Sequence, residues 1–110
     1  MSENVNVAEQ TAVVRKEVIK KDRFYLGIQV QTAKKGNNAG NKFGICYLYE
    51  HRTYDDNSTG FSIAEIMMSF DKVKELLALS IPVFDPVKVE FEEQDSFYAK
   101  PKIKKLIPLV

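Results

Sequence analysis

The sequence predicts a mainly β domain of five strands, with one short helix between the third and the fourth strand. Three observations support this prediction. Apolar and polar residues alternate in several segments, and a period of two is typical of half-buried strands. Only one segment has the three-to-four-residue apolar spacing of a helix. Runs rich in Gly, Asn, Asp and Pro separate these segments, as turns do.

A chain of 110 residues is long enough for one domain with a modest core. We expect residues 1–22 to form a flexible N-terminal arm and residues 23–110 to form the domain. The segment 13–21, "VVRKEVIKK", leaves two alternatives open: a continuation of the arm, or a strand that docks elsewhere. The first strand is predicted over residues 23–34, where Phe24 begins an alternating apolar series and is assigned to the core.

The second strand, "KFGICYLYEHRTY", follows a Gly/Asn-rich loop and is rich in aromatic residues. Alternation divides it into two faces. One face carries Phe43, Ile45, Tyr47 and Tyr49, and the other carries Gly44, Cys46 and Leu48. Because the first face includes an isoleucine, we expect some of its aromatic rings to lie in the core. Tyrosine commonly buries its ring and leaves its hydroxyl wet, so packing and stacking both stay open for each tyrosine here.

A turn, "DDNSTG", leads to a third strand over residues 61–70, although the composition of this segment leaves a helix as an alternative. The helix is predicted within "SFDKVKELLALS", with Ser69 or Asp71 as its N-cap. Two prolines in "SIPVFDP" end it. The fourth strand covers residues 87–93, and the last strand is "KIKKLIPLV".

Three meandering strands, a short helix and a final hairpin are the element order of the OB-fold, a partly open five-stranded barrel. A ferredoxin-like fold needs helices after the first and third strands, and an SH3-like barrel is almost entirely strand. The sequence therefore predicts a five-stranded OB-fold barrel in the order β-β-β-α-β-β.

The chain offers little for catalysis or metal binding. His51 is its only histidine and Cys46 its only cysteine, and on an extended strand they point to opposite faces. A zinc site needs about four nitrogen or sulfur ligands, and "DDNSTGFSIAEI" lacks the closing acid of a calcium loop. We therefore predict a protein that is not an enzyme and uses no cofactor and no metal.

No apolar run approaches the length of a membrane span, and the N-terminus lacks the apolar core of a signal peptide. The single cysteine gives no intramolecular disulfide and no sign of an oxidising compartment. We therefore expect a cytoplasmic protein that does not bind membranes.

The net charge of +1 hides a segregation of charge along the chain. Residues 15–42 carry eight basic and two acidic side chains, whereas residues 55–95 carry three basic and ten acidic ones. Residues 100–105 carry four lysines and no acid. The two basic blocks suit a polyanionic partner if folding brings them together, and the simpler interpretation is that charge segregates on solvated faces.

Single-stranded nucleic acid is bound by a positive groove along its backbone and by aromatic rings on which bases stack. In an OB barrel, oligonucleotides lie across the second and third strands and the loops after the first and fourth strands. Both loops carry basic residues beside aromatic ones, and we expect Tyr54 and Tyr98, in turns, to be the better stacking residues. The candidate residues are Lys34, Lys35, Lys42, Phe43, Tyr47, Tyr49, Arg52, Tyr54, Tyr98, Lys100 and Lys102.

The lysine-bearing loop before "NKFGICYLY" and the closing "VKVEFEEQDSFYAKPKIKKLIPLV" resemble the small OB-fold single-stranded DNA-binding proteins of filamentous phages and of Gram-positive conjugative plasmids. The resemblance covers residues 23–110 as a pattern of strands and loops. It implies cooperative, sequence-independent coating of single strands by a homo-oligomer. This chain differs in its longer arm and in its helix, "DKVKELLAL", and the segment "AVVRKEVI" would suit addition to a neighbour's strand edge.

The predicted function is therefore sequence-independent binding of single-stranded DNA, in phage replication or plasmid conjugation. Nothing in the sequence separates DNA from RNA as the ligand. The alternative is a non-catalytic protein-interaction module of a phage, conjugation or secretion machine, which would use its strand edges for contact. The near-neutral total charge is the main objection to DNA binding, because it limits long-range attraction.

Overall fold

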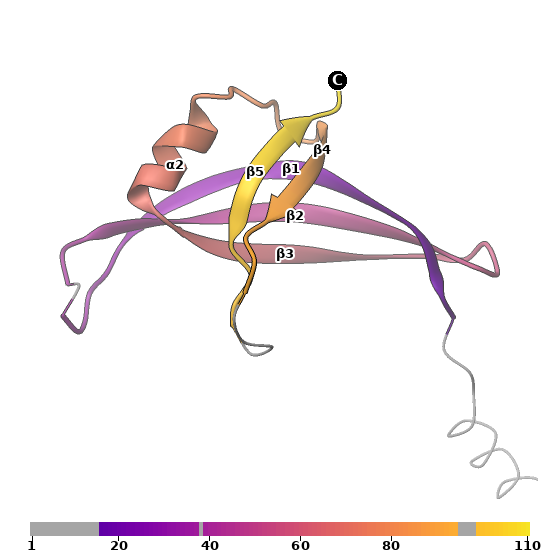
Figure 1. Ribbon diagram of the computed structural model, residues 1–110, viewed down its shortest axis with the longest axis horizontal. Coiled ribbons are helices and arrows are strands. Elements are labelled where there is room, and N and C mark those ends of the chain that lie inside the picture. Colours follow the sequence, from indigo (N-terminus) through magenta and orange to yellow (C-terminus); the bar gives the residue numbers. More distant parts are fainter. Residues whose placement is uncertain (1–15, 38, 95–98) are drawn as a thin grey trace, which may run out of the picture.

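The computed structural model describes residues 16–37, 39–94 and 99–110. In these residues it has five antiparallel strands and one helix (Figure 1). Their bounds are β1 Val18–Thr32, β2 Lys42–Tyr54, β3 Thr59–Ser69, α2 Phe70–Leu77, β4 Pro86–Phe91 and β5 Ile103–Pro108. The prediction of a mainly β domain with a short helix between the third and fourth strands is confirmed. The segment 61–70, for which a helix was the alternative prediction, lies in the strand β3 up to Ser69.

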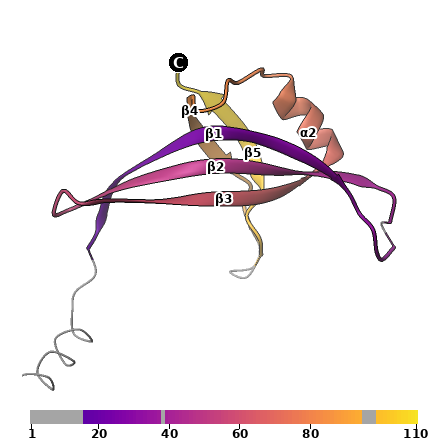
Figure 2. The same cartoon turned by 180° about the vertical axis from the view of Figure 1, so that it is seen from behind.

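The strand order in the sheet is β3-β2-β1-β4-β5. The first three strands form a long, curved ribbon, and the β4–β5 hairpin crosses one face of it, in front in Figure 1 and behind in Figure 2. Helix α2 packs on the same face, where Val73 and Leu76 are buried. We call this covered side of the ribbon the core face and the opposite side the outer face. Strands β3 and β5 are the two edges of the sheet.

Strand β1 begins at Val18, five residues before the predicted start. Val18 pairs with Tyr54, so β1 pairs with β2 as far as the last residue of β2. Of the two alternatives for residues 13–21, the strand is therefore correct from Val18 on, and residues 13–15 lie outside the described part. Charged residues at 20–22 interrupt the apolar alternation, which is why periodicity alone placed the start too late.

The assignment of Phe24 to the core is wrong, because β1 contains a bulge. The register with β2 shifts between Tyr25 and Gly27, and an extra residue in a strand reverses the alternation beyond it. Tyr25 opposes Leu48 before the bulge, and Ile28 opposes Cys46 after it. Both therefore face the core, and Tyr25 is buried with 6% of its surface exposed. Phe24 lies on the outer face.

The core is built on the Cys46 and Leu48 face of β2, where both side chains have no exposed surface. Around them pack buried residues from every other element: Tyr25, Ile66, Leu76, Val87, Val89, Ile103 and Leu106. None of the aromatic side chains on the other face of β2 is among the buried residues. The expectation that some of them are core is therefore wrong, since α2 and the β4–β5 hairpin cover the opposite side.

Gly44 is where α2 comes closest to the ribbon. A Cβ atom at this position would lie 2.1 Å from Cγ2 of Val73, and Val73 is fully buried. A glycine is therefore needed at position 44 for the helix to pack on β2.

The N-cap of α2 is Ser69, one of the two residues predicted for this position. Its hydroxyl accepts a hydrogen bond from the Lys72 backbone N–H.

Gly44→Ala should lower the free energy of unfolding by about 1–3 kcal/mol, because the added methyl group overpacks a site that has no room. For a domain of this size the thermal midpoint should fall by about 4–8 °C per kcal/mol. Thermal unfolding followed by circular dichroism measures it. Adding Val73→Ala in the same chain should restore part of the loss, and an unchanged midpoint in Gly44→Ala would show that the helix does not pack this closely.

Candidate nucleic-acid interface

The outer face of the ribbon carries aromatic and apolar side chains of three strands. From β2 it presents Phe43, Ile45, Tyr47 and Tyr49, which oppose Ser69, Met67, Glu65 and Ile63 of β3. Phe61 is 66% exposed, and Ile63 and Met67 are each more than half exposed. We call this surface, formed by Phe24, Phe43, Ile45, Tyr47, Tyr49, Phe61, Ile63 and Met67, the aromatic face. The residues of β1 and β2 in it are partly buried, and the exposed carboxylate of Glu65 lies within it opposite Tyr47.

Tyr49 lies at the centre of a ring cluster on the aromatic face. Its ring is 5.5 Å from that of Phe61 and nearly parallel to it, and 6.0 Å from the tilted ring of Phe24. The ring of His51 also stacks on that of Tyr49, with 6.5 Å between their centres. These neighbours hold Tyr49 in a defined orientation and leave Phe61 as a broad exposed plane.

Phe24 and Phe61 are not among the candidates that the sequence predicts. Apolar alternation predicts Phe24 in the core, and it predicts Phe61 only as part of the third strand. A usable signal existed for Phe61: it alternates with Ile63 and Met67 on β3, so these three residues share one face. The bulge that turns Phe24 outward has no comparable sequence signal.

Tyr47 is oriented by a polar contact rather than by packing. Its hydroxyl donates a hydrogen bond to Oε1 of Gln29 at 3.0 Å, and Nε2 of Gln31 donates to the same oxygen at 3.2 Å. All three side chains project from the outer face of the ribbon. The Tyr47 ring is therefore positioned at the surface, where a flat ligand could lie on it.

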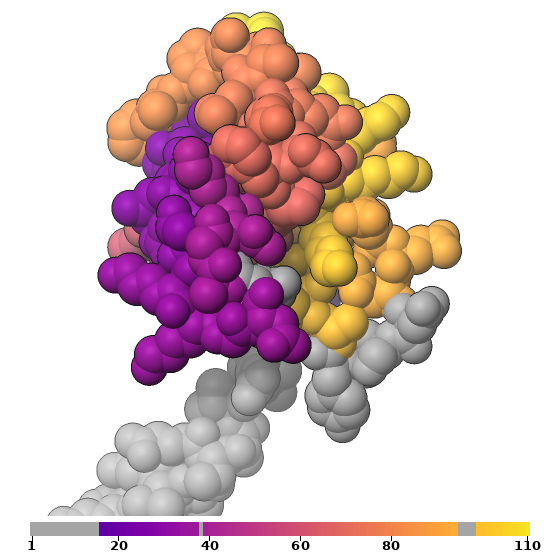
Figure 3. Space-filling view, turned by 90° about the vertical axis from the view of Figure 1, so that its left-hand side faces the viewer, coloured from indigo at the N-terminus to yellow at the C-terminus, as the bar shows by residue number. Residues whose placement is uncertain are grey.

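The two predicted basic loops approach β3 from two sides and meet at Met67. Lys35 and Lys42 line a cavity of about 340 Å³ together with Phe43 and Met67. Lys100 and Lys102 line another, of about 310 Å³, with Met67 as a shared wall. Seen from the end of the ribbon, the β1–β2 loop lies on one side and the β4–β5 hairpin on the other, with α2 above them (Figure 3).

The lysines of these loops form no ion pair with a described acid, although Glu65 lines the same cavity as Lys100 and Lys102. Six basic residues form ion pairs within the described residues: Lys16, Lys20, Arg23, Arg52, Lys72 and Lys74. By contrast, Lys34, Lys35, Lys42, Lys100 and Lys102 form none with any acid in the described part of the chain. The ammonium group of Lys42 lies instead 5.6 Å from the ring centre of Phe70. Of the nine described basic residues without an ion pair, these five lie in the two loops beside the aromatic face, and the other four are Lys21, Lys88, Lys104 and Lys105.

Arg52 and Tyr54 are separated from the other candidates. They have the same parity on β2 as Leu48, so they lie on the side opposite Tyr47 and Tyr49. Arg52 is paired with Glu50 at 3.2 Å, and the Tyr54 ring packs at Gly60, where a Cβ atom would lie 3.2 Å from its hydroxyl. Tyr98, predicted with Lys100 and Lys102, lies outside the described residues.

Glu50 anchors a small ionic network on the core face. Nε of Arg23 donates to its carboxylate at 2.8 Å, and the Arg23 guanidinium also lies 5.4 Å from the ring centre of Phe91. Burial by itself would raise the pKa of Glu50, but the hydrogen bond and charge of Arg23, with Lys21 and Arg52, outweigh it. The pKa of Glu50 is therefore lower than usual.

A group whose pKa is lowered by folding contributes stability above its ordinary pKa, about 4.3 for glutamate, and loses it as the pH falls through the folded value. Glu50→Gln should therefore be less stable than the wild type at neutral pH, and the difference should shrink on acidification below pH 4. Urea unfolding at a series of pH values measures it. A constant difference between pH 7 and pH 3 would contradict the ionic role of Glu50.

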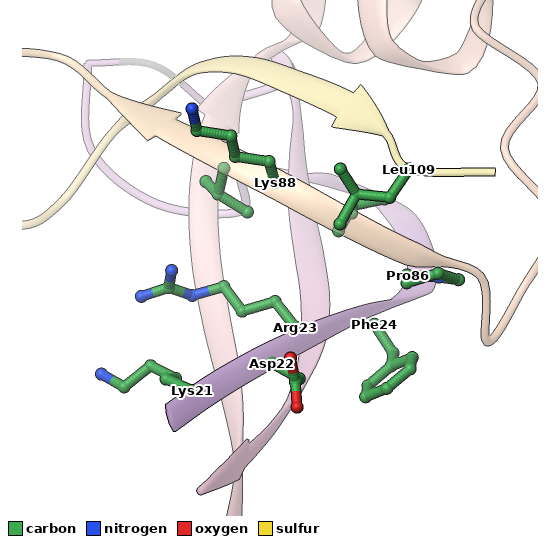
Figure 4. A pocket seen from close by; sticks show the side chains of 9 residues that line it. Lys21, Asp22, Arg23, Phe24, Pro86, Lys88 and Leu109 are labelled. Carbon is green, nitrogen blue, oxygen red and sulfur yellow. The ribbon is translucent and has the colours of Figure 1, made fainter. Parts of the chain in front are cut away.

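A further cavity, of about 220 Å³, lies where β1 meets β4. Lys21 and Arg23 extend from one side of β1, and Phe24 points away from them (Figure 4). Lys88 of β4 completes the basic lining. Since Arg23 is already engaged by Glu50 and Phe91, this cavity has less free positive charge than the loops around Met67.

In the part of the chain that the structure describes, no group of three or more His, Cys, Asp or Glu side chains is placed to hold a metal ion. Cys46 lies in the core and His51 on the outer face, and burial raises the pKa of the Cys46 thiol to about 12. No helix among these residues is long and apolar enough to cross a bilayer.

Comparison of the chain with protein-family models, curated proteins and solved structures gives no match.

Proposed function

We propose that this protein binds single-stranded DNA without sequence preference, by electrostatic contacts from the two basic loops and base stacking on the aromatic face. One observation carries the proposal: the core of the ribbon uses Cys46 and Leu48, which leaves Tyr47, Tyr49 and Phe61 at the surface. Exposed aromatic rings beside unpaired lysines are the two components that single-strand binding requires.

We further propose that the fold is an OB barrel. The strand order β3-β2-β1-β4-β5 leaves β3 and β5 as the edges, and bringing the end of β3 against the start of β5 at Ile103 would close a five-stranded barrel while leaving the rest of the β5 edge open. Met67 and Met68 of β3 already line a cavity with Ile103 of β5. The helix between β3 and β4 and the binding surface on β2 and β3 also fit this fold.

Fluorescence anisotropy of a labelled thymidine oligonucleotide of about 30 bases, titrated at low and high salt, tests the proposal. We expect tight binding that weakens as salt rises, because bound phosphates release counterions. A duplex of the same length should bind much more weakly, since its bases are not free to stack. A matching RNA strand shows whether the site separates DNA from RNA. Absence of binding at low salt would refute the proposal.

The second candidate function is a protein-interaction module, and the aromatic face is also the observation that favours it. Exposed apolar residues such as Phe61, Ile63 and Met67 are typical of protein contacts as well. This function predicts no affinity for oligonucleotides and no effect of the loop lysines on the interaction. The resemblance to phage and plasmid proteins leads us to place either function in phage replication or plasmid conjugation.

A further inference from the structure

An apolar groove separates α2 from β5, away from the aromatic face. Leu76 and Leu79 form its α2 side, and Leu106 of β5 forms its other wall. Its volume is about 230 Å³, and Leu79 is nearly half exposed. Lys104 and Lys105 line the β5 side and form no ion pair with any described acid. Glu75 of α2 also lines the groove, but its carboxylate is paired with Lys72. The rim therefore keeps the positive charge of Lys104 and Lys105 beside an apolar floor.

The groove runs beside a free strand edge. β5 is the last strand of the sheet, and Leu109 donates its N–H to the Pro86 carbonyl on the β4 side. Backbone groups of successive residues alternate between the two edges of an antiparallel strand, so Leu106 points its N–H and carbonyl outward. The Lys104 carbonyl also points outward, where it accepts a hydrogen bond from Nζ of Lys72 at 3.1 Å. An extended segment could pair here over a few residues, because Pro108 has no N–H to continue the pairing.

The chain itself contains a segment that fits this groove. Residues 1–14 carry Glu3 and Glu9 and no basic residue. In an extended conformation the residues Glu3, Val5, Val7 and Glu9 share one face, since side chains alternate with a period of two. Two valines between two acids complement an apolar floor with lysines on its rim.

A neighbouring copy is better placed to supply this segment than the same chain. The described chain starts at Lys16, which is paired with Asp56 at 2.8 Å beside the β2–β3 turn. This turn and α2 lie at opposite ends of the ribbon (Figure 1). The 15 residues before Lys16 span at most about 50 Å when extended, which is enough to reach an adjacent molecule.

We propose that residues 1–14 of one copy add as a short strand to the outer edge of β5 in the next copy, with Val5 and Val7 in the groove and one of the two flanking glutamates, Glu3 or Glu9, directed toward Lys104 and Lys105. The last residues of "AVVRKEVI", from Val18 on, cannot add to a neighbour's strand edge, because they belong to β1. The contact is head-to-tail, so copies assemble into open chains or rings. It does not depend on nucleic-acid binding.

Sedimentation of the full chain without nucleic acid tests this proposal over a range of protein concentrations. The wild type should associate with increasing concentration, and removal of residues 1–14 should leave monomers. Leu79→Asp should also leave monomers, and since Leu79 is nearly half exposed and lies beyond the end of α2, the thermal midpoint of this variant should stay near the wild-type value. A wild type that stays monomeric, including one whose arm occupies its own groove, would overturn the proposal.

A charge-reversal pair identifies the contact. Glu3→Lys with Glu9→Lys in one chain, and Lys104→Glu with Lys105→Glu in another, should each reduce self-association. Mixing the two chains should restore association, because each reversed rim then meets a reversed arm. Failure of the mixture to associate, with both variants folded, would refute this groove as the site. Oligonucleotide binding is measured separately, so either proposal can fail while the other stands.

Discussion

Tyr47→Ala combined with Tyr49→Ala should weaken the binding of a thymidine oligonucleotide by at least about 25-fold at fixed salt. Each stacked base contributes about 1–3 kcal/mol, which corresponds to about 5- to 150-fold in affinity for each ring. The effect is expected to be large because both rings lie on the outer face, where no core residue can replace them. Anisotropy titration at one low salt concentration measures it.

Tyr54→Ala is the matched control for this double variant. It removes the same type of side chain from the same strand, but its ring packs at Gly60 on the side opposite Tyr47 and Tyr49. We expect its affinity to stay within about two-fold of the wild type, since it removes no stacked base. If Tyr54→Ala weakened binding as much as the double variant, base stacking on the aromatic face would not be the mechanism.

Replacing the five loop lysines by glutamine should have the second large effect, on the salt dependence of binding. For single strands, the slope of log affinity against log salt changes by about 0.7 for each phosphate contact. Loss of all five contacts should therefore flatten the slope by about 3.5, with the greatest loss of affinity at low salt. The residues are Lys34, Lys35, Lys42, Lys100 and Lys102.

The control for this variant uses lysines that already have acidic partners. Lys16, Lys20, Lys72 and Lys74 are paired with Asp56, Asp22, Glu75 and Asp71. Replacing these four by glutamine should change the slope far less, since their charge is already compensated within the protein. An equal change of slope in both variants would mean that total charge, and not the arrangement of the two loops around Met67, determines binding.

The number, type and order of the elements could be predicted from the sequence because each depends on local spacing. Alternation marked the strands, Ser69 marked the start of the helix, and Gly/Asn and Asp-rich runs marked the turns. The prolines did not mark the end of the helix, because it ends at Leu77, five residues before Pro82. The sequence also shows which residues of β2 share a face. Arg52 and Tyr54 are an odd number of residues from Tyr47 and Tyr49, so they lie on the opposite face. The predicted site wrongly placed residues of both faces together.

Which face of β2 is buried was decided only by tertiary structure. Both faces carry apolar residues, so alternation defines two surfaces without saying which is covered. The choice depends on α2 and the β4–β5 hairpin, which follow much later in the chain and pack where Gly44 leaves room. In the same way, the bulge beside Tyr25 exchanged the faces of β1, because strand register is set by the partner strand and not by the strand alone.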